Sequence, residues 1–229
     1  MSQSNDFPTR RKSGRNVEPG TAPPTGRGRP RDPTTDESAL AAARVILATE
    51  GYTGLTFRNV AERAGVTRPT LYTRWPTKVH LAYDAAFPAD DGALVIDTDD
   101  FVSDIRRLMV AAAASYSRPA TRAALPLLLA EFQRDPSLQT ELREPNESEV
   151  RARFAHIVDK AVTLKHVVPE VNAHVLFDTI VGAIQFRAVF HRGVDQSFID
   201  SLQSTIFDGV LRSHGTDEAA STAEIAAEQ

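Results

Sequence analysis

The chain has 229 residues, 41% of them hydrophobic, which is enough for one compact core or for a small module joined to a larger one. The absence of cysteine excludes disulfide bridges and thiolate metal sites and favours a reducing compartment, so we expect a cytoplasmic protein. We recognise neither an export signal nor a run of about 18 apolar residues, and we therefore expect no membrane partner.

The net charge of −4 is unevenly distributed along the chain. Residues 1–80 contain 13 Lys and Arg against 7 Asp and Glu, whereas residues 81–229 contain 13 against 23. This split favours contact between the N-terminal part and a polyanion, while the acidic remainder keeps the protein soluble. Charge alone leaves a chance distribution as the alternative.

Residues 1–33 are rich in Pro, Gly, Ser, Thr and Arg and almost free of large apolar side chains, so we expect a disordered basic arm. Within it, Arg27-Gly28-Arg29-Pro30 reproduces the core of an AT-hook, in which two guanidinium groups enter a narrow A·T minor groove. We interpret Arg27 and Arg29 as minor-groove contacts. A generic basic linker that only attracts phosphates is the alternative.

The first two helices are expected behind this arm. Residues 35–50 place apolar side chains on one face and end at Gly51, which is typical of a helix stop. A second helix follows Thr56, whose side chain suits an N-cap, and Gly65 provides the sharp turn after it.

The third helix is predicted to begin at Arg68, after the capping residue Thr67, and to run to about Trp75. Pro69 fits there because the N–H groups of a first helical turn have no partner within the helix. Leu71 and Trp75 supply the face that anchors it to the core. Two short helices joined by a glycine turn are typical of a helix-turn-helix, whose second helix enters the major groove of DNA.

The stretch GLTFRNVAERAGVTRPTLYTRWPTKVHLAYDAAF resembles the N-terminal signature of TetR-family transcriptional repressors, with the resemblance covering residues 35–87. A small residue and a threonine precede the second helix. Ala-x-x-Ala-Gly-Val, Thr-Leu-Tyr and aromatic-Pro-x-Lys then follow in order and at the family spacing. Pro69 departs from the Gly or Ala of many members, which alters the groove contact and leaves the assignment unchanged.

Side chains of the second and third helices are the expected DNA contacts. Arg68 could donate two hydrogen bonds to guanine, and Pro69 and Thr70 could touch a thymine methyl group. The resemblance places Thr56, Arg58, Tyr72, Thr73, Arg74 and Lys78 on phosphates, with a solvated charge as the alternative for Arg58 and a core aromatic for Tyr72. The full set is Thr56, Arg58, Thr67, Arg68, Pro69, Thr70, Tyr72, Thr73, Arg74 and Lys78.

Behind the signature, residues 76–87 predict a fourth helix that joins the reading helices to the remainder. Further helical patterns cover 100–117, 119–134, 136–144, 147–164, 169–191 and 195–213, and 214–229 form a loose acidic tail. Pro126 is expected to kink or divide its helix. The predicted fold is therefore all-α, with a three-helix DNA-binding domain at 34–87 and a larger helical domain at 88–213, which the resemblance implies is a ligand-binding and dimerisation domain.

The segment 169–191 is apolar over more than half its circumference, which indicates two packing partners. In TetR-like proteins the last two long helices form a four-helix dimer interface, so the resemblance implies a homodimer. A buried core helix is the alternative. The interface candidates are Gly182, Ala183, Phe186, Phe190, Phe198, Leu202 and Ile206.

The resemblance also implies an effector pocket among the C-terminal helices. The candidates are Tyr116, Phe132, Phe154, Phe177 and Gln185, with Arg122 and His156 as polar contacts. Plain core packing is the alternative for each of them. An apolar cavity with few polar groups suits a hydrophobic or aromatic small molecule.

We expect no enzyme activity, cofactor or metal, because the chain has no phosphate loop, no Gly-x-Ser-x-Gly and no complete dinucleotide fingerprint. His80 and Asp84 lie one turn apart and favour surface polarity over a metal site. Asp97, Asp99 and Asp100 lack the pattern of a calcium loop and favour helix capping.

The sequence thus predicts a ligand-responsive repressor that binds a pseudo-palindromic operator as a homodimer. The alternative is an effector-independent, architectural DNA-binding protein that uses only the arm and the reading helices. The long helical segment 88–213 favours the first of these.

Overall fold

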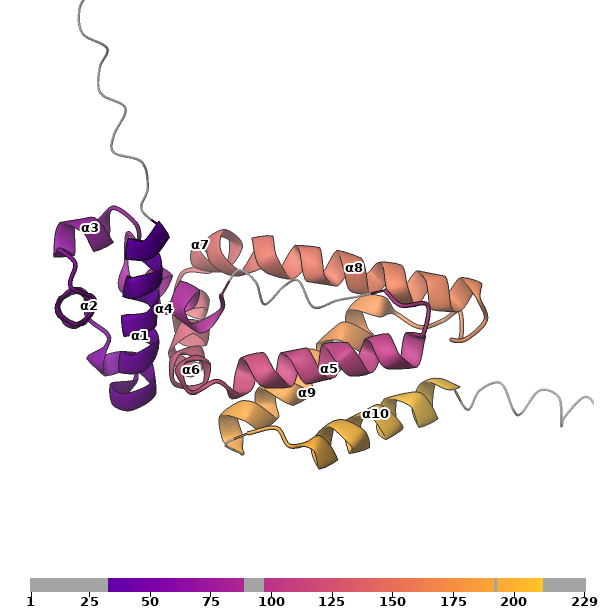
Figure 1. Cartoon of the computed structure of the whole chain (residues 1–229). Coiled ribbons are helices and arrows are strands. Elements are labelled where there is room, and N and C mark those ends of the chain that lie inside the picture. Colours follow the sequence, from indigo (N-terminus) through magenta and orange to yellow (C-terminus); the bar gives the residue numbers. More distant parts are fainter. Residues whose placement is uncertain (1–32, 89–96, 192, 212–229) are drawn as a thin grey trace, which may run out of the picture. The chain divides into compact units, whose positions relative to one another are not determined.

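The computed structural model describes residues 33–88, 97–191 and 193–211, all within one compact unit (Figure 1). Every regular element in these ranges is a helix, which confirms the all-α fold class. The predicted minor-groove residues Arg27 and Arg29 and the expected tail at 214–229 lie outside the described residues.

Four helices make up the N-terminal part. They are α1 (Pro33–Gly54), α2 (Phe57–Ala64), α3 (Arg68–Tyr72) and α4 (Lys78–Ala86). α1 packs against α2 and α4, and α2 packs against α3. α1 is longer than expected, but Gly51 within it has φ 69° and ψ −173°, a conformation that glycine adopts without strain, so the regular helix does end there.

Local capping determines where the two short helices α2 and α3 begin and where α2 ends. Thr56 Oγ1 accepts a hydrogen bond from the N–H of Asn59 at 3.1 Å, and Thr67 Oγ1 accepts one from the N–H of Thr70 at 3.4 Å. Gly65 ends α2 in the left-handed conformation, with φ 68° and ψ 27°. The structure therefore confirms both predicted caps and the predicted turn, which satisfy N–H groups that would otherwise lack a partner.

α3 is shorter than expected, because it ends at Tyr72 and not near Trp75. The N–H of Trp75 still donates to the carbonyl oxygen of Leu71 at 2.8 Å, but Trp75 precedes Pro76, and the position before a proline disfavours helical geometry. Leu71 and Trp75 are both buried, which confirms the anchoring face. Trp75 Nε1 also donates to Asp84 Oδ2 at 2.8 Å.

The C-terminal part is a second group of helices. They are α5 (Phe101–Ser117), α6 (Pro119–Arg134), α7 (Pro136–Leu138), the π-helical segment η2 (Gln139–Arg143), α8 (Glu144–Thr163), α9 (Ala173–Phe190) and α10 (Gln196–Leu211). Pro126 does not divide α6, where the neighbouring Leu125 and Leu128 are buried and hold both sides in place. The expected single helix at 136–144 is instead α7 followed by η2.

Two hydrophobic clusters form the core. The first combines side chains of α1 to α4 with those of α6, including Leu47, Leu71, Leu81 and Leu128, each fully buried. The second joins α5, α8, α9 and α10. Burial of each leucine stabilises the fold by about 1.5–3 kcal/mol. Because α6 completes the first core, the N-terminal helices are packed directly onto the C-terminal part.

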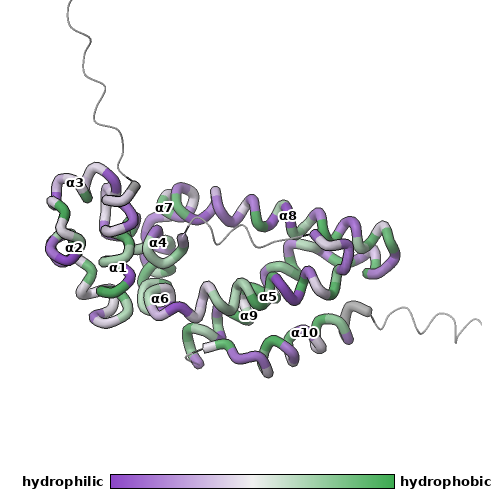
Figure 2. The backbone as a smooth tube through the Cα atoms, in the orientation of Figure 1, coloured by the Kyte–Doolittle hydropathy of each residue, from purple (hydrophilic) through white to green (hydrophobic). Residues whose placement is uncertain are grey.

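α9 is the most apolar of these helices, and hydrophobic residues follow one another along much of its length (Figure 2). Within the described part of the chain it alone has the length and hydropathy to cross a membrane, a segment that the sequence inspection did not recognise. It packs against α5, α6 and α8, with Ile180 and Ile184 fully buried. We therefore interpret it as a core helix that also exposes one apolar face.

Candidate functional site

The first candidate site is the exposed face of α3. Arg68, Pro69 and Tyr72 are exposed there, whereas Leu71 is buried on the opposite side. Arg68 has no ion-pair or hydrogen-bond partner among the described residues, so its guanidinium is available to a ligand. A short helix of this kind fits a major groove about 12 Å wide.

The threonine hydroxyls on and beside this face already form hydrogen bonds within α2, α3 and the residues that cap them. The Oγ1 atoms of Thr67 and Thr70 lie 2.8 Å apart, and Thr73 Oγ1 donates to the carbonyl oxygen of Thr70 at 2.6 Å. The hydroxyl of Thr56 holds the start of α2. A base contact by Thr70 would therefore use its methyl group, which is the contact predicted for it.

Tyr72 is 55% exposed, and its ring centroid lies 4.3 Å from that of Phe57 at the start of α2. This position excludes the alternative that Tyr72 is a core aromatic. The ring packs against the first turn of α2 while the side chain remains accessible at the rim of the exposed face of α3.

Two predicted phosphate contacts carry positive charge near this face. The exposed Arg58 pairs with Glu62 one turn later, with Nε and Oε1 2.9 Å apart. The ammonium of Lys78, at the start of α4, lies 4.0 Å from the ring centroid of Tyr52, and partial burial lowers its pKa. An exposed ion pair such as that of Arg58 contributes little to stability.

Arg74 differs from the other predicted DNA contacts. Its Nη1 atom lies 2.9 Å from Asp36 Oδ2 in α1, and its side chain is only 16% exposed. The second carboxylate oxygen, Asp36 Oδ1, is buried without a hydrogen-bond partner among the described residues. Arg74 therefore ties the end of α3 to the start of α1, and its guanidinium is not presented to solvent like that of Arg68.

His80 connects α4 to the C-terminal part. It is buried, with Nδ1 2.8 Å from Thr77 Oγ1 and Nε2 3.1 Å from Glu141 Oε1 in η2. The sequence interpretation of His80 and Asp84 as surface polarity is wrong for His80, because packing against η2 covers the ring. Among the described residues, no three His, Cys, Asp or Glu are grouped as a metal site.

The second candidate site is a cavity of about 400 Å³ among the C-terminal helices. Its wall combines residues from α4, α5, α6, η2, α8 and α9. Four of the predicted pocket residues line it, namely Tyr116, Phe132, Phe177 and Gln185. The predicted interface residue Gly182 lines it as well.

Three other predicted pocket residues do not line the cavity. Phe154 lies in the core behind it, with its ring centroid 5.5 Å from that of Phe177. His156 projects from the outside of α8, with Nε2 3.9 Å from Asp97 Oδ2, and Arg122 lies on α6 away from the lining. Helical spacing alone does not show which face of α6 or α8 meets the cavity.

The sequence inspection missed four charged residues of the lining, which we call the charged wall: Arg143, Glu147, Arg151 and Asp178. The first three are spaced by four residues, so their shared face could have been inferred from the sequence. Asp178 lies on α9, and only the packing of α8 against α9 brings it to Arg151.

α4 reaches the cavity through Tyr83 and Phe87. Their ring centroids lie 5.2 Å apart, and Phe87 also lies 6.0 Å from Tyr116 of α5. Burial raises the pKa of Tyr83, and it raises that of Tyr116 to about 12, so both hydroxyls remain protonated at neutral pH. The cavity thus offers neutral aromatic groups next to the helix that follows α3.

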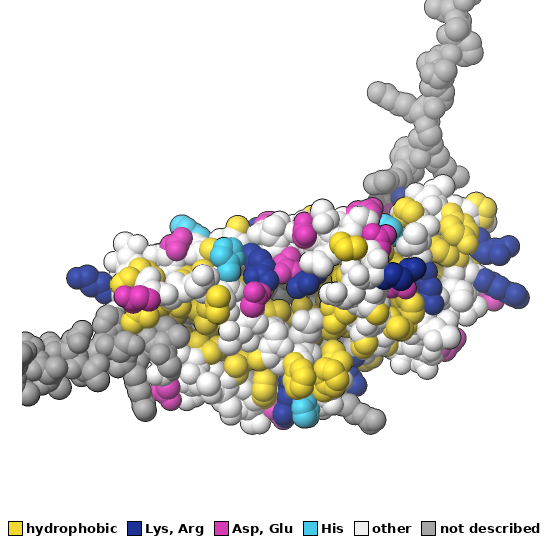
Figure 3. Space-filling model, turned by 180° about the vertical axis from the view of Figure 1, so that it is seen from behind, with side chains coloured by type: hydrophobic (Ala, Val, Ile, Leu, Met, Phe, Trp, Pro, Cys, Tyr) yellow, Lys and Arg dark blue, Asp and Glu magenta, His cyan; other side chains and the backbone are white. Residues whose placement is uncertain are grey.

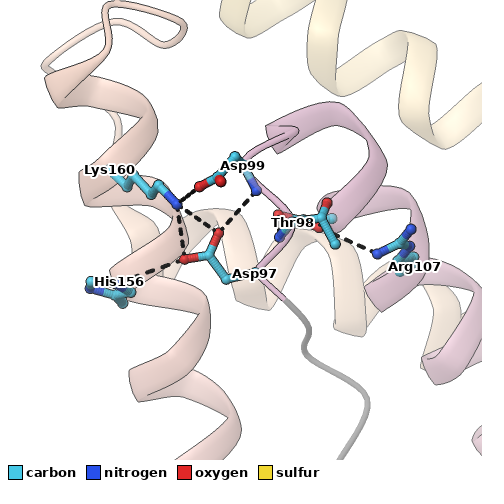
Figure 4. Close-up of polar contacts among 7 residues, drawn as sticks. Asp97, Thr98, Asp99, Arg107, His156 and Lys160 are labelled. Carbon is cyan, nitrogen blue, oxygen red and sulfur yellow. Dashed lines mark hydrogen bonds and ion pairs between the residues drawn. The ribbon is translucent and has the colours of Figure 1, made fainter.

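The acidic stretch before α5 does not form a third site. Asp100 caps α5 by accepting from the N–H of Ser103 at 3.2 Å, which confirms capping for this residue. Asp97 and Asp99 instead face Lys160 of α8, with Asp97 Oδ1 3.0 Å from its ammonium (Figure 4). These ion pairs fasten the start of α5 to α8.

The predicted dimer face is partly open. Phe186 and Phe190 of α9, the exposed aromatic pair, are 59% and 68% exposed, and their ring centroids lie 4.7 Å apart. The face of the molecule seen in Figure 3 carries several apolar patches among its polar and charged side chains. Ala183, Phe198 and Leu202 are half-buried, whereas Ile206 is buried in the core and does not contribute to this surface.

Comparison with known proteins identifies relatives over most of the chain. Residues 39–84 match the family model of the bacterial regulatory proteins of the tetR family, and residues 95–206 match that of the tetracyclin repressor-like C-terminal domain. The HTH-type transcriptional regulator YdeS of Bacillus subtilis is 29% identical over 196 residues, which are 83% of this chain and 97% of YdeS.

Two further proteins extend this comparison. The HTH-type transcriptional regulator Rv1556 of Mycobacterium tuberculosis is 27% identical over 192 residues, which are 81% of this chain and 92% of Rv1556. The crystal structure of the TetR family transcription regulator SCO0332 is 34% identical, with a TM-score of 0.59 and coverage of 77% of this chain and 98% of that one.

Proposed function

Because the chain belongs to the TetR family of bacterial transcriptional regulators, we propose that it is a repressor that binds a pseudo-palindromic operator as a homodimer and is released by a small, mainly apolar effector. Its relatives are helix-turn-helix regulators of transcription, and regulators of this class bind DNA. Such a protein works in the cytoplasm, where the operator is.

The cavity of about 400 Å³ carries the effector part of this proposal, because α4 supplies part of its wall through Tyr83 and Phe87. α4 begins at Lys78, shortly after α3. An effector that fills the cavity would press on α4 and tilt it, which would change the separation of the two reading helices in a dimer. That separation has to match about one turn of DNA, roughly 34–36 Å.

The exposed aromatic pair supports the homodimer. Two aromatic side chains exposed next to each other on an apolar helix favour burial against a partner. A second copy offers the same face, and a two-fold interface of this kind explains why the operator is expected to be pseudo-palindromic.

The reading of DNA follows from the exposed face of α3. Arg68 is the base-reading residue, with Pro69 and Thr70 against a thymine methyl group. Thr56, Arg58, Thr67, Tyr72, Thr73 and Lys78 surround it as backbone contacts. Arg27 and Arg29 of the arm add contacts in the minor groove.

The test begins with selection of operator sequences from random DNA by the full-length protein. We expect an enriched site with two inverted half-sites. A library of small apolar compounds is then screened for thermal stabilisation, and each compound that binds is titrated against the protein–operator complex. An effector that weakens operator binding by a given factor must itself bind the complex more weakly by the same factor.

Two outcomes would contradict the proposal. Enrichment of a single, asymmetric site would refute the homodimeric operator complex. Compounds that bind the cavity without changing operator affinity would favour the effector-independent DNA-binding protein instead.

A further inference from the structure

The charged wall of the cavity is a continuous chain of ion pairs. Glu147 accepts from Arg143 through one carboxylate oxygen and from Arg151 Nε through the other, at 2.7 Å for Arg151. Arg151 in turn donates to Asp178 of α9, and its guanidinium carbon lies 4.4 Å from the ring centroid of Phe177. Positive and negative groups therefore alternate along the wall.

The formal charges of this wall cancel. Two arginines face two carboxylates, and each arginine is paired with at least one of them. Glu147 is central, because its side chain is only 21% exposed and both of its oxygens are in use. Removing a partner from a half-buried charge is costly, since the charge that remains has lost both its water and its ion pair.

A charged ligand would meet groups whose charges are already neutralised. A carboxylate that reached Arg143 or Arg151 would bring a second negative charge next to Glu147, and an ammonium that reached Glu147 or Asp178 would bring a second positive charge next to the arginines. In both cases the ligand would lose its hydration without gaining an unpaired counter-charge. A neutral ligand leaves all the pairs intact.

The rest of the lining suits such a neutral ligand. Phe87, Phe132 and Phe177 provide apolar surface, and Gln185 and the protonated hydroxyl of Tyr116 provide hydrogen-bonding groups without charge. Cavities of this composition bind mainly through apolar contact and orient the ligand through a few polar groups.

We propose that the cavity selects an uncharged, mainly apolar molecule with a hydrogen-bond acceptor, such as an aromatic ketone, and that the internally paired charged wall rejects its ionised analogues. The inference rests on the proposed function, because it takes this cavity as the effector site.

Three probes with one biphenyl body test the selectivity: 4-acetylbiphenyl, biphenyl-4-carboxylate and the ammonium form of biphenyl-4-ylmethylamine. Each is titrated calorimetrically into the full-length protein at pH 7. We expect the ketone to bind at least about tenfold more tightly than either ion, because an ion would lose its hydration without gaining an unpaired counter-charge. Tighter binding of either ion, or no binding of any probe, would overturn the proposal.

Charge variants test the cause of the selectivity. Glu147→Gln removes the negative charge that the two arginines share, and we expect the carboxylate probe to gain about tenfold relative to the ketone. Arg143→Gln should produce the same gain for the ammonium probe. Glu149→Gln is the matched control, because Glu149 lies on α8, pairs with Arg153 and does not line the cavity; it should leave the order of the three probes unchanged.

Unfolding curves show whether each variant is folded. If Glu147→Gln does not fold, Asp178→Asn serves in its place, because Asp178 is exposed and also pairs with Arg151. Equal weakening of all three probes in a folded Glu147→Gln variant would reduce the wall to a structural role and overturn the proposal.

Operator binding separates this inference from the proposed function. If the ketone binds with the expected selectivity but leaves operator affinity unchanged, the cavity chemistry holds and the repressor mechanism fails. If an ionised probe both binds most tightly and releases the operator, the repressor mechanism holds and the inference fails.

Discussion

At the residue scale, the contacts proposed for Arg68 and Lys78 with DNA are of two different kinds. Arg68→Ala should cost about 1–3 kcal/mol on the operator and relax base preference at one position of each half-site, because a bidentate contact to guanine is lost. Lys78→Ala should weaken all sequences about equally and reduce the salt dependence of binding. Fluorescence anisotropy with single-base operator variants at several salt concentrations distinguishes them. Unchanged base preference in Arg68→Ala would make Arg68 a phosphate contact.

Arg74 is expected to act on stability more than on DNA affinity. Arg74→Ala leaves the partly buried carboxylate of Asp36 without its partner, so the free energy of unfolding should fall by about 1–3 kcal/mol. Urea denaturation of Arg74→Ala, Asp36→Asn and the double variant measures the coupling between the two side chains. If stability were unchanged and only DNA affinity fell, Arg74 would be a phosphate contact as first predicted.

At the element scale, α9 has one face in the core and one exposed aromatic pair. Phe186→Glu should produce monomers that bind the operator weakly, because two buried charges would face each other across a two-fold interface. Leu127→Glu is the control, since Leu127 is an exposed apolar residue on α6. Sedimentation at micromolar concentration measures the assembly. A wild-type monomer under these conditions would refute the interface.

At the scale of the whole molecule, the His80–Glu141 contact joins α4 to η2, whose last residue, Arg143, belongs to the charged wall. Glu141→Gln should reduce the effect of an effector on operator affinity while leaving the separate affinities for effector and DNA nearly unchanged. Glu144→Gln is the control, because Glu144 accepts a hydrogen bond from Thr140 and has no hydrogen bond or ion pair with α4 among the described residues. The measurement is operator affinity with and without a saturating effector. If the effector changed operator affinity equally in Glu141→Gln and Glu144→Gln, the His80–Glu141 contact would not link the cavity to DNA binding.

The contribution of the basic arm to DNA affinity is tested by comparing the full-length protein with a form that lacks the arm. Deletion of residues 1–33 should lower affinity most on operators flanked by A·T tracts, because a narrow minor groove concentrates the negative potential that attracts arginine. Binding to operators with A·T and G·C flanks measures the difference. Equal losses that low salt restores would favour the basic-linker interpretation of Arg27 and Arg29.

The sequence by itself determined the features that depend on neighbouring residues. Thr56 and Thr67 as caps, Gly65 as a turn and the buried pair Leu71 and Trp75 all rest on contacts within a few positions, and the structure confirms them. The same short spacings carried the resemblance to the TetR family, which is why the all-α fold could be predicted.

Only the tertiary structure decided which side chains meet across helices. It brought Arg74 to Asp36, His80 to Glu141 and Arg151 to Asp178. It also placed Phe154 and His156 outside the cavity wall. Helical periodicity shows that a helix has an apolar face, but the partner of that face depends on how distant helices pack, so the place of Asp178 in the charged wall and the role of Arg74 could not be predicted from local sequence.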